Sequence, residues 1–271
     1  MPNIMYYDDV KILKKPLKQR LKSILKFFLI IAVVVGCFFG ATYISSALTV
    51  GNLTSYIVYG STTVKFDKKT KYAVILGKYD TYNEAERVAL GSTIQGASGY
   101  VWQDGDVYYV IVNIYYSKSD DEKVIENIGG SNYHTEIFGI SFGNLSLNFD
   151  MYDNSDMPTI NKSLEIFEDA YIELYDYSIK YDSGEISHLA VSSNISKLRG
   201  EVKSLIVGVQ NLINKSSSSL GVVQDYLVRL DEVLDQAILK TIDNTATNYS
   251  LKNAIAIIVR LEYELRYKLK G

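Results

Sequence analysis

The stretch "YAVILGKYDTYNEAERVA", residues 72–89, returns in outline as "YYVIVNIYYSKSDDEKVI" at residues 108–125. Each copy begins with alternating apolar and β-branched residues, the pattern of a half-buried strand. A Thr or Ser followed three positions later by Glu comes next, which is the spacing of a capping box at the start of a helix. Apolar residues then recur at helical spacing. Each copy therefore predicts a strand followed by a helix.

Two further strands complete the predicted unit. Between the copies, Asp104-Gly105 lies between apolar runs and predicts a hairpin. After the second copy, "TEIFGISF" at residues 135–142 alternates again. The order strand, helix, strand, strand, helix, strand between about Lys71 and Phe142 predicts a small α+β domain of split βαβ (ferredoxin-like) type. Its two helices would cover one face of an antiparallel sheet and leave the other face open.

Period-two alternation assigns side chains to the two faces of this sheet. Toward the helices we expect Val74, Leu76, Tyr108, Val110, Val112 and Ile114. On the open face we expect Ala73, Ile75, Tyr109, Ile111 and Tyr115, with Trp102 or Tyr100 from the neighbouring strand. Such an apolar, aromatic face suits stacking on sugar rings. It also suits packing under the helical region that follows, and the sequence leaves both alternatives open.

Residues about 70–143 resemble the SPOR domain, a repeat domain of bacterial envelope proteins. "YAVILGKYDTYNEAE" is similar to the family's opening motif, with Gly77 at its glycine, Tyr79 at its aromatic position and Ala85 at its helix alanine. "YYVIVNIYYSKSDDE" is similar to the motif of its second half. The resemblance implies the fold described above. It also implies binding to septal peptidoglycan, particularly to glycan strands stripped of their stem peptides.

The resemblance places glycan contacts on the open sheet face. The residues that it implies are Ile75, Trp102, Tyr109, Ile111 and Tyr115. The chain departs from the family pattern at three positions, with Ile75 in place of Gln, Tyr109 in place of Arg and Asn113 in place of Gly. These departures leave the expected fold unchanged and alter the chemistry of the expected binding face.

The residues from Phe27 to Leu48, "FFLIIAVVVGCFFGATYISSAL", include no charged side chain. At about 1.5 Å per residue, a helix of this length measures roughly 33 Å, enough to cross the hydrocarbon core of a bilayer. The basic residues 1–26 mark the cytoplasmic side by the positive-inside rule, so everything after Leu48 would lie outside. We expect an uncleaved single-pass transmembrane helix. A signal peptide cleaved near Ser45-Ser46-Ala47 is the alternative.

Charge and cysteine content restrict what the exterior can do. The formal net charge is −3, and residues 1–26 hold seven basic side chains against two acidic ones, so about −8 remains for the rest. An acidic exterior argues against binding to nucleic acid. The single cysteine, Cys37, lies in the apolar span, so disulfides and reactive thiolates are excluded outside it.

The rest of the chain divides into a tether and a helical region. Residues 49–70, rich in Thr and Ser, predict a tether ahead of the SPOR-like domain at 71–150, and residues 143–158 predict one more strand and a loop. From Thr159 to Gly271, four amphipathic helices with short connections predict an antiparallel bundle as a second domain. Their apolar stripes begin at Leu164, Val202, Leu220 and Leu251. We interpret the run of Ser at 216–219 as a turn rather than a linker.

No pattern in the chain indicates catalysis. His134 and His188 lie in different predicted domains, and neither has a second ligand at metal-binding spacing. Acidic pairs such as Glu84 and Glu86 fall in the first turns of predicted helices, where carboxylates are expected on dipole grounds. A further acidic helix face, which we expect to be solvated, comprises Glu165, Glu168, Asp169 and Glu173. We therefore expect no catalytic residue, no metal site, no cofactor and no enzymatic activity.

Two functions remain for a membrane-anchored, extracytoplasmic protein of the bacterial cell envelope. The SPOR resemblance implies that it binds peptidoglycan glycan strands and localises to the cell-division or sporulation septum. The alternative is a protein–protein interaction scaffold without glycan binding, in which the sheet face is buried and the helical bundle holds an envelope protein partner.

Overall fold

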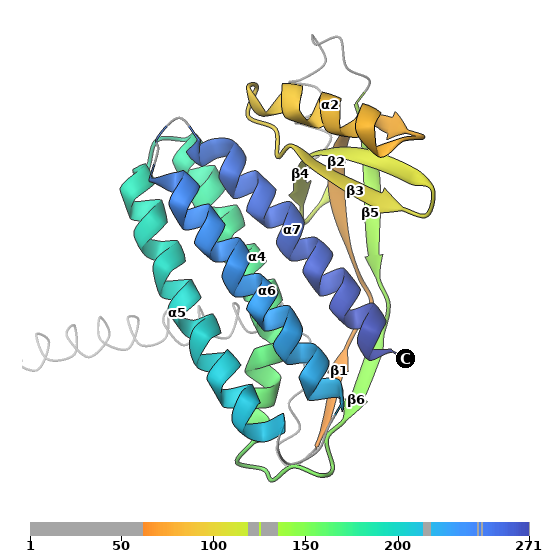
Figure 1. Ribbon diagram of the computed structural model, residues 1–271, viewed down its shortest axis with the longest axis vertical. Helices are drawn as coiled ribbons and strands as arrows, with labels where there is room; N and C mark the ends of the chain where they lie inside the picture. The colour runs from red at the N-terminus through yellow and green to blue at the C-terminus, as the bar shows by residue number, and fades with distance from the viewer. Residues whose placement is uncertain are drawn as a thin grey trace, which may run out of the picture. The chain divides into compact units, whose positions relative to one another are not determined.

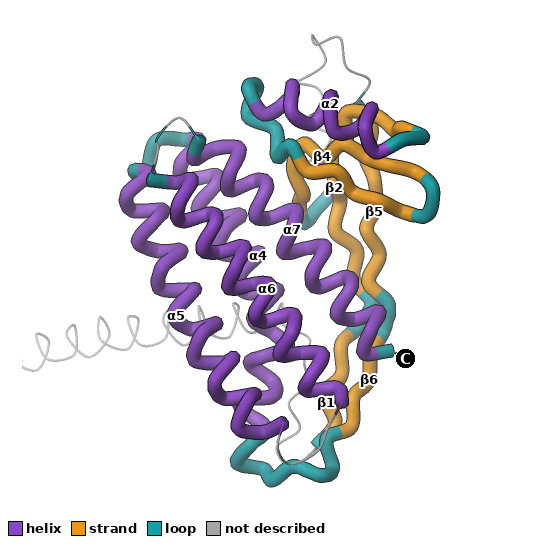
Figure 2. Tube along the Cα trace, viewed as in Figure 1, coloured by secondary structure: helices purple, strands orange, loops and turns teal. Residues whose placement is uncertain are grey.

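The structure is a computed structural model that describes residues 62–118, 125, 135–213, 218–242, 244 and 246–270 (Figures 1 and 2). The elements in chain order are β1 (Thr63–Phe66), β2 (Lys69–Tyr79), α2 (Tyr82–Thr93), β3 (Tyr100–Asp104), β4 (Val107–Tyr115), β5 (Glu136–Phe142), β6 (Leu145–Asn148), α4 (Met157–Asp182), α5 (His188–Ile213), α6 (Ser218–Thr241) and α7 (Thr247–Leu269). Among the described residues, antiparallel strands and the short helix α2 precede the long helices, so the predicted α+β class is confirmed.

The first strands of the two repeated stretches, β2 and β4, pair with each other in the centre of the main sheet. This sheet is antiparallel and has the order β3-β4-β2-β5. The predicted hairpin joins β3 to β4, and Gly105 in its turn has a φ of 58°, a left-handed conformation that glycine adopts easily.

A second antiparallel pair joins β1 to β6 (Figure 1). The strand predicted between residues 143 and 158 is therefore confirmed as β6. β1 and the first residues of β2 belong to the segment 49–70 that was predicted to be a tether. That prediction is wrong for residues 63–66 and 69–70, because residues 63–66 pair with β6 and residues 69–70 pair with β5.

The Thr81–Glu84 pair predicted as a capping box lies at the start of α2, with Thr81 as the N-cap. The Thr81 hydroxyl accepts a hydrogen bond from the Glu84 backbone N–H at 3.4 Å and donates one to Glu84 Oε2 at 3.1 Å. The helix buries Ala85 and Ala89 at helical spacing against the sheet. The first copy of the repeat therefore forms the strand and helix that its sequence predicts.

The sheet face beneath α2 has the side chains that alternation assigned to it. A small hydrophobic cluster combines α2 with the buried sheet residues Val74, Leu76, Val110 and Val112, and the partly buried Tyr108 packs against it. The helix predicted after Ser119 lies outside the described residues except for Ile125, which is partly buried against this same cluster. The prediction is thus confirmed for one helix of the pair.

Four long helices, α4 to α7, follow as predicted. Each packs against its neighbour in the chain, and α7 closes the group by packing against α4 (Figure 1). Pro158 lies in the first turn of α4, where the missing N–H has no intrahelical partner to lose.

The main sheet and the long helices share one hydrophobic core. Its buried residues include Ile75, Trp102 and Ile111 from the sheet together with Phe167 of α4 and Ile258 of α7. Residues 55–271 accordingly form one compact unit. The boundary predicted between a domain at 71–150 and a domain at 159–271 does not separate two cores.

The predicted cytoplasmic tail (1–26) and transmembrane helix (27–48) lie outside the described residues. None of the helices that the structure does describe combines the length and the apolar run needed to cross a bilayer.

Candidate functional site

The sheet face that was expected to be open lies under α7 and α4. Ile75 and Ile111 are direct partners across β2 and β4, and both are fully buried. Trp102 on β3 is only 2% exposed. The alternative in which this face packs under the helical region is confirmed, because these three residues belong to the core shared with the long helices.

Trp102 marks where α7 crosses the sheet. Its ring meets Tyr263 edge-on, with centroids 5.7 Å apart, and the Arg260 guanidinium lies 4.9 Å from its ring centroid. Arg260 also donates a hydrogen bond to the Gln103 carbonyl at 2.9 Å, and Asn253 donates one to the Ser98 carbonyl at 2.9 Å. We call the contact of this sheet face with α4 and α7 the sheet–helix joint. Its buried apolar sheet residues are Ala73, Ile75, Trp102, Ile111, Ile114, Ile140 and Phe142.

Tyr109 lies on the same face but is only partly buried. Its ring stacks on Phe138 of β5, with centroids 4.4 Å apart and planes 17° from parallel. Of the five residues predicted to contact glycan, Tyr109 therefore lies on the predicted face and keeps some exposure to solvent.

Tyr115 lies on the opposite face from the one predicted, because β4 has a bulge. The strand register moves from Val74–Asn113 to Ile75–Ile111, so one step along β2 spans two residues of β4. Side chains beyond the bulge exchange faces. Ile114 enters the sheet–helix joint, and Tyr115 packs against the cluster beneath α2. The face predictions for Ile114 and Tyr115 are both wrong for this reason.

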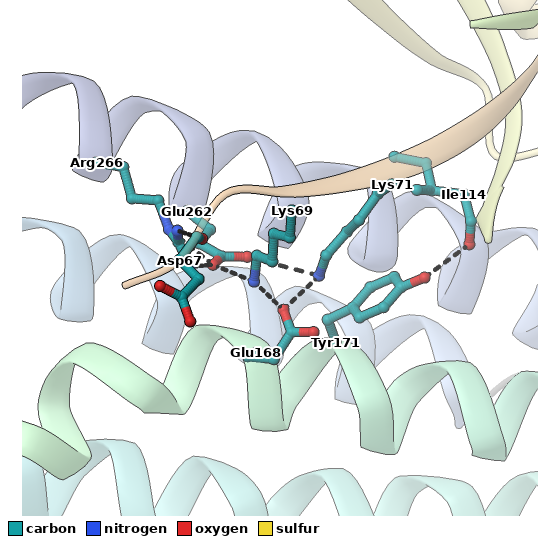
Figure 3. A network of polar contacts seen from close by, with 8 residues as sticks. All are labelled: Asp67, Lys69, Lys71, Ile114, Glu168, Tyr171, Glu262 and Arg266. Atoms are coloured by element: carbon teal, nitrogen blue, oxygen red, sulfur yellow. Dashed lines mark hydrogen bonds and ion pairs between the residues drawn. The ribbon is translucent and has the colours of Figure 1, made fainter. Parts of the chain in front are cut away.

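Charged side chains lie at the other end of the joint, and the spacing in each element explains how they meet. Lys69 and Lys71 are two apart on β2 and so share the face of Ala73 and Ile75. Glu262 is four residues before Arg266 on α7, so both project from one side of that helix. Glu168 and Tyr171 are three residues apart on α4, so they also project from one side of their helix. Figure 3 shows these side chains pointing toward one another.

The two carboxylates bridge the three cations. Lys69 Nζ lies 2.5 Å from Glu168 Oε2 and 2.6 Å from Glu262 Oε1. Lys71 Nζ lies 2.6 Å from Glu168 Oε2 and 3.5 Å from Glu262 Oε2. Arg266 Nη2 reaches Glu262 Oε1 at 2.9 Å. We call these five residues the buried ion cluster.

Aromatic rings enclose the amine of Lys71. Its Nζ lies 3.4 Å from the centroid of Tyr171, and the Tyr171 hydroxyl donates a hydrogen bond to the Ile114 carbonyl at 3.4 Å (Figure 3). The Lys71 side chain is 2% exposed and that of Glu262 is 5% exposed. Because an ammonium and a carboxylate are costly to bury alone, the mutual pairing is what keeps both charged here.

Burial and charge shift the pKa values of the two deepest groups in opposite senses. Burial is the largest cause for Lys71 and, with Lys69, outweighs the carboxylates of Glu262 and Glu168, lowering its pKa to about 8. For Glu262, burial acts to raise the pKa, but Lys69, Lys71 and Arg266 together hold it well below its ordinary value.

The cluster therefore joins β2 to α4 and α7, and the Lys71 amine within it is shielded from solvent. A groove of about 270 Å³ lies between α6 and α7, and a hollow of about 110 Å³ lies beside Arg266 and Lys270. Lys71 lines neither of them. In the part of the chain that the structure describes, no group of three or more His, Cys, Asp or Glu side chains is placed to hold a metal ion.

The sequence patterns predicted neither this cluster nor the contacts of Glu168 within it. The acidic face of α4 was expected to be solvated, whereas Glu168 binds two lysines at the joint. A usable signal existed in β2, where alternation puts Lys69 and Lys71 on the same face as apolar Ala73 and Ile75. Charged side chains on an otherwise apolar, buried face need partners of opposite charge that are buried with them. No local pattern identifies those partners on α4 and α7.

Comparison of the chain with protein-family models, with curated proteins and with solved structures finds no match.

Proposed function

We propose that this protein is a membrane-anchored, extracytoplasmic scaffold of the cell envelope that binds other proteins and performs no catalysis. The observation that carries the proposal is the burial of Ile75, Ile111 and Trp102 beneath α7 and α4. A face used for internal packing is not available to stack on a glycan strand. The alternative scaffold function required such a buried face.

The SPOR resemblance then concerns the ancestry of the sheet rather than its present use. The strand order β3-β4-β2-β5, with the two repeated stretches in the centre, is compatible with a domain built from two βα halves. We propose that the long helices occupy the surface that a free domain of this type would offer to glycan.

A binding experiment with purified cell-wall sacculi separates the two functions. The full chain in detergent micelles should sediment with sacculi no more than an unrelated protein does, including sacculi stripped of stem peptides. Tyr109→Ala is the matched variant, because Tyr109 keeps some exposure on the predicted face. Retention on stripped sacculi that Tyr109→Ala reduces would restore the glycan-binding function.

The scaffold function makes its own positive prediction. Leu189 and Val207 on α5 and Leu239 on α6 are exposed apolar side chains on the long helices. A photo-crosslinking amino acid at these positions should yield discrete adducts with envelope proteins in cells. The same substitution at Val209, which is fully buried two residues from Val207, serves as the control. Adducts absent from all three exposed positions would contradict a partner on this part of the bundle.

The anchor is part of the proposal and has a separate test. It is supported by the basic residues before Phe27 and the uncharged residues up to Leu48. A reporter that is active only outside the cytoplasm, fused after Gly271, should be active, and the protein should remain with membranes. Soluble secreted protein that lacks the first 47 residues would show that the segment is a cleaved signal peptide.

A further inference from the structure

Two ammonium groups converge on one oxygen in the buried ion cluster. Lys69 Nζ and Lys71 Nζ lie 2.5 and 2.6 Å from Glu168 Oε2, so the two nitrogens are at most about 5 Å apart, a separation at which like charges disfavour each other. Lys71 is the more deeply placed, since its side chain is 2% exposed against 27% for Lys69. Burial therefore opposes the charged form of the Lys71 amine.

The charges around Lys71 do not balance while it is protonated. The groups that face it are Lys69 on β2, Glu168 and Tyr171 on α4, Glu262 and Arg266 on α7, Tyr116 just after β4 and the ring of Phe142 on β5. Three cations then stand against two carboxylates. Loss of one proton leaves two cations and two carboxylates in a site from which water is largely excluded.

We propose that Lys71 makes the sheet–helix joint responsive to pH, so that release of its proton tightens the contact of β2 with α4 and α7. The device lies in the fold itself and does not depend on which partner the protein binds. A fixed ionic bridge would behave differently, because its contribution to stability would not change with pH in the mildly alkaline range.

The direction of the response follows from the pKa of Lys71, which falls from 10.5 to about 8 chiefly because the side chain is buried. A base with a lower pKa in the folded state gives up its proton there first. Between about pH 8 and 10.5 the unfolded state binds more protons, so stability rises with pH. For these two values the unfolding equilibrium constant should fall about tenfold between pH 7 and 9.

The test is denaturant unfolding of the full chain in detergent micelles at pH values from 6 to 10, followed by Trp102 fluorescence. Lys71→Met keeps the length of the side chain and leaves two cations with two carboxylates. We expect the tenfold fall in the wild type to be absent from Lys71→Met. Lys180→Met removes an exposed lysine of α4, 43% exposed and paired with Asp176, and should retain the fall.

A second measurement requires no variant. In protein with 13C-labelled lysine, one lysine resonance should titrate near pH 8. If every lysine titrates above about pH 9.5, the proposal is overturned. It is also overturned if Lys71→Met lowers stability equally at pH 7 and pH 9, which is the result expected of a fixed bridge.

Discussion

The carboxylate of Glu262 lies among three cations and is almost shielded from water. Lys69 and Arg266 contact its Oε1, and Lys71 faces its Oε2. If the carboxylate is removed, only Glu168 remains to compensate three positive charges. Loss of one partner from a buried pair typically costs several kcal/mol, since the charge left behind is no longer solvated by water or by an ion.

We expect Glu262→Gln to lower the free energy of unfolding by about 3–5 kcal/mol at pH 7. Glu264→Gln is the matched control on the same helix, because Glu264 pairs with Arg260 and Arg229 at a position where its side chain is 28% exposed. Its cost should stay near 1 kcal/mol or below. The comparison is made from denaturant midpoints. Equal losses in the two variants would mean that the cluster is no more than a surface network.

The dependence of stability on acidic pH should report the same carboxylate, that of Glu262. Its pKa lies below the ordinary 4.5 in the folded state, where three cations outweigh the opposing effect of burial. The stability that it contributes is therefore complete above pH 4.5 and is lost as the pH falls toward the folded value. Wild-type protein should lose more stability than Glu262→Gln between pH 5 and pH 3. Parallel pH profiles for the two proteins would contradict this expectation.

The partial burial of Glu168 could not have been predicted from its helix alone. Its neighbours Glu165, Asp169 and Glu173 make an acidic stripe of the kind that usually faces solvent. What distinguishes Glu168 is contact with Lys69 and Lys71, almost a hundred residues earlier in the chain. Helical periodicity reports which side of a helix is apolar and says nothing about a charge that arrives from another element.

At the scale of elements, the repeated strand and helix were predictable, but the bulges were not. Alternation placed Val74 and Val110 correctly because both precede the irregularity in their strands. It failed for Ile114 and Tyr115 because an extra residue near Val112 shifts the period by one. The residues at the bulge, Val112 and Asn113, include no Gly or Pro that would mark an irregularity. The shift of register therefore becomes visible only in the pairing of β4 with β2.

Gly77 belongs to a second irregularity, between Ile75 and Lys78 on β2. Its φ is 137°, and an added Cβ would lie 3.1 Å from the Tyr79 hydroxyl. We expect Gly77→Ala to cost about 1–3 kcal/mol, because the backbone conformation is unfavourable for any side chain. Thermal or denaturant unfolding measures this loss directly.

Gly91 supplies the contrasting substitution. It lies within α2 with no atom close to an added Cβ. Gly91→Ala should therefore raise stability by about 0.5–1 kcal/mol, since alanine restricts the unfolded chain and favours the helix. If Gly91→Ala is as damaging as Gly77→Ala, the local backbone is not what decides either outcome.

At the scale of the whole molecule, α7 is the element that joins the parts. It buries residues on several sides, including Ile255, Ala256, Ile258 and Leu261, because helices lie on one side of it and the sheet on the other. A helix that is buried around most of its circumference belongs to the centre of a fold. The sequence showed four amphipathic stripes but not that α4 and α7 each need a second partner. The predicted domain boundary at Pro158 was misleading for that reason.

The shared core makes a final prediction about cooperativity. Trp102 is the single tryptophan of the chain and lies in the sheet–helix joint against Tyr263, so its fluorescence reports the loss of the joint. Far-ultraviolet circular dichroism reports mainly the long helices. Because residues 55–271 form one compact unit, the two signals should change together along a denaturant gradient, as in two-state unfolding.

Truncation sharpens that prediction. A segment of residues 157–271 alone would expose the sides of α4 and α7 that the sheet covers. We expect it to retain helical circular dichroism but to bind a hydrophobic dye and unfold without a sharp transition, because its packing partner is missing. Two independent domains would behave differently. Trp102 fluorescence would then change at its own denaturant concentration, and the isolated helices would unfold as cooperatively as they do in the full chain.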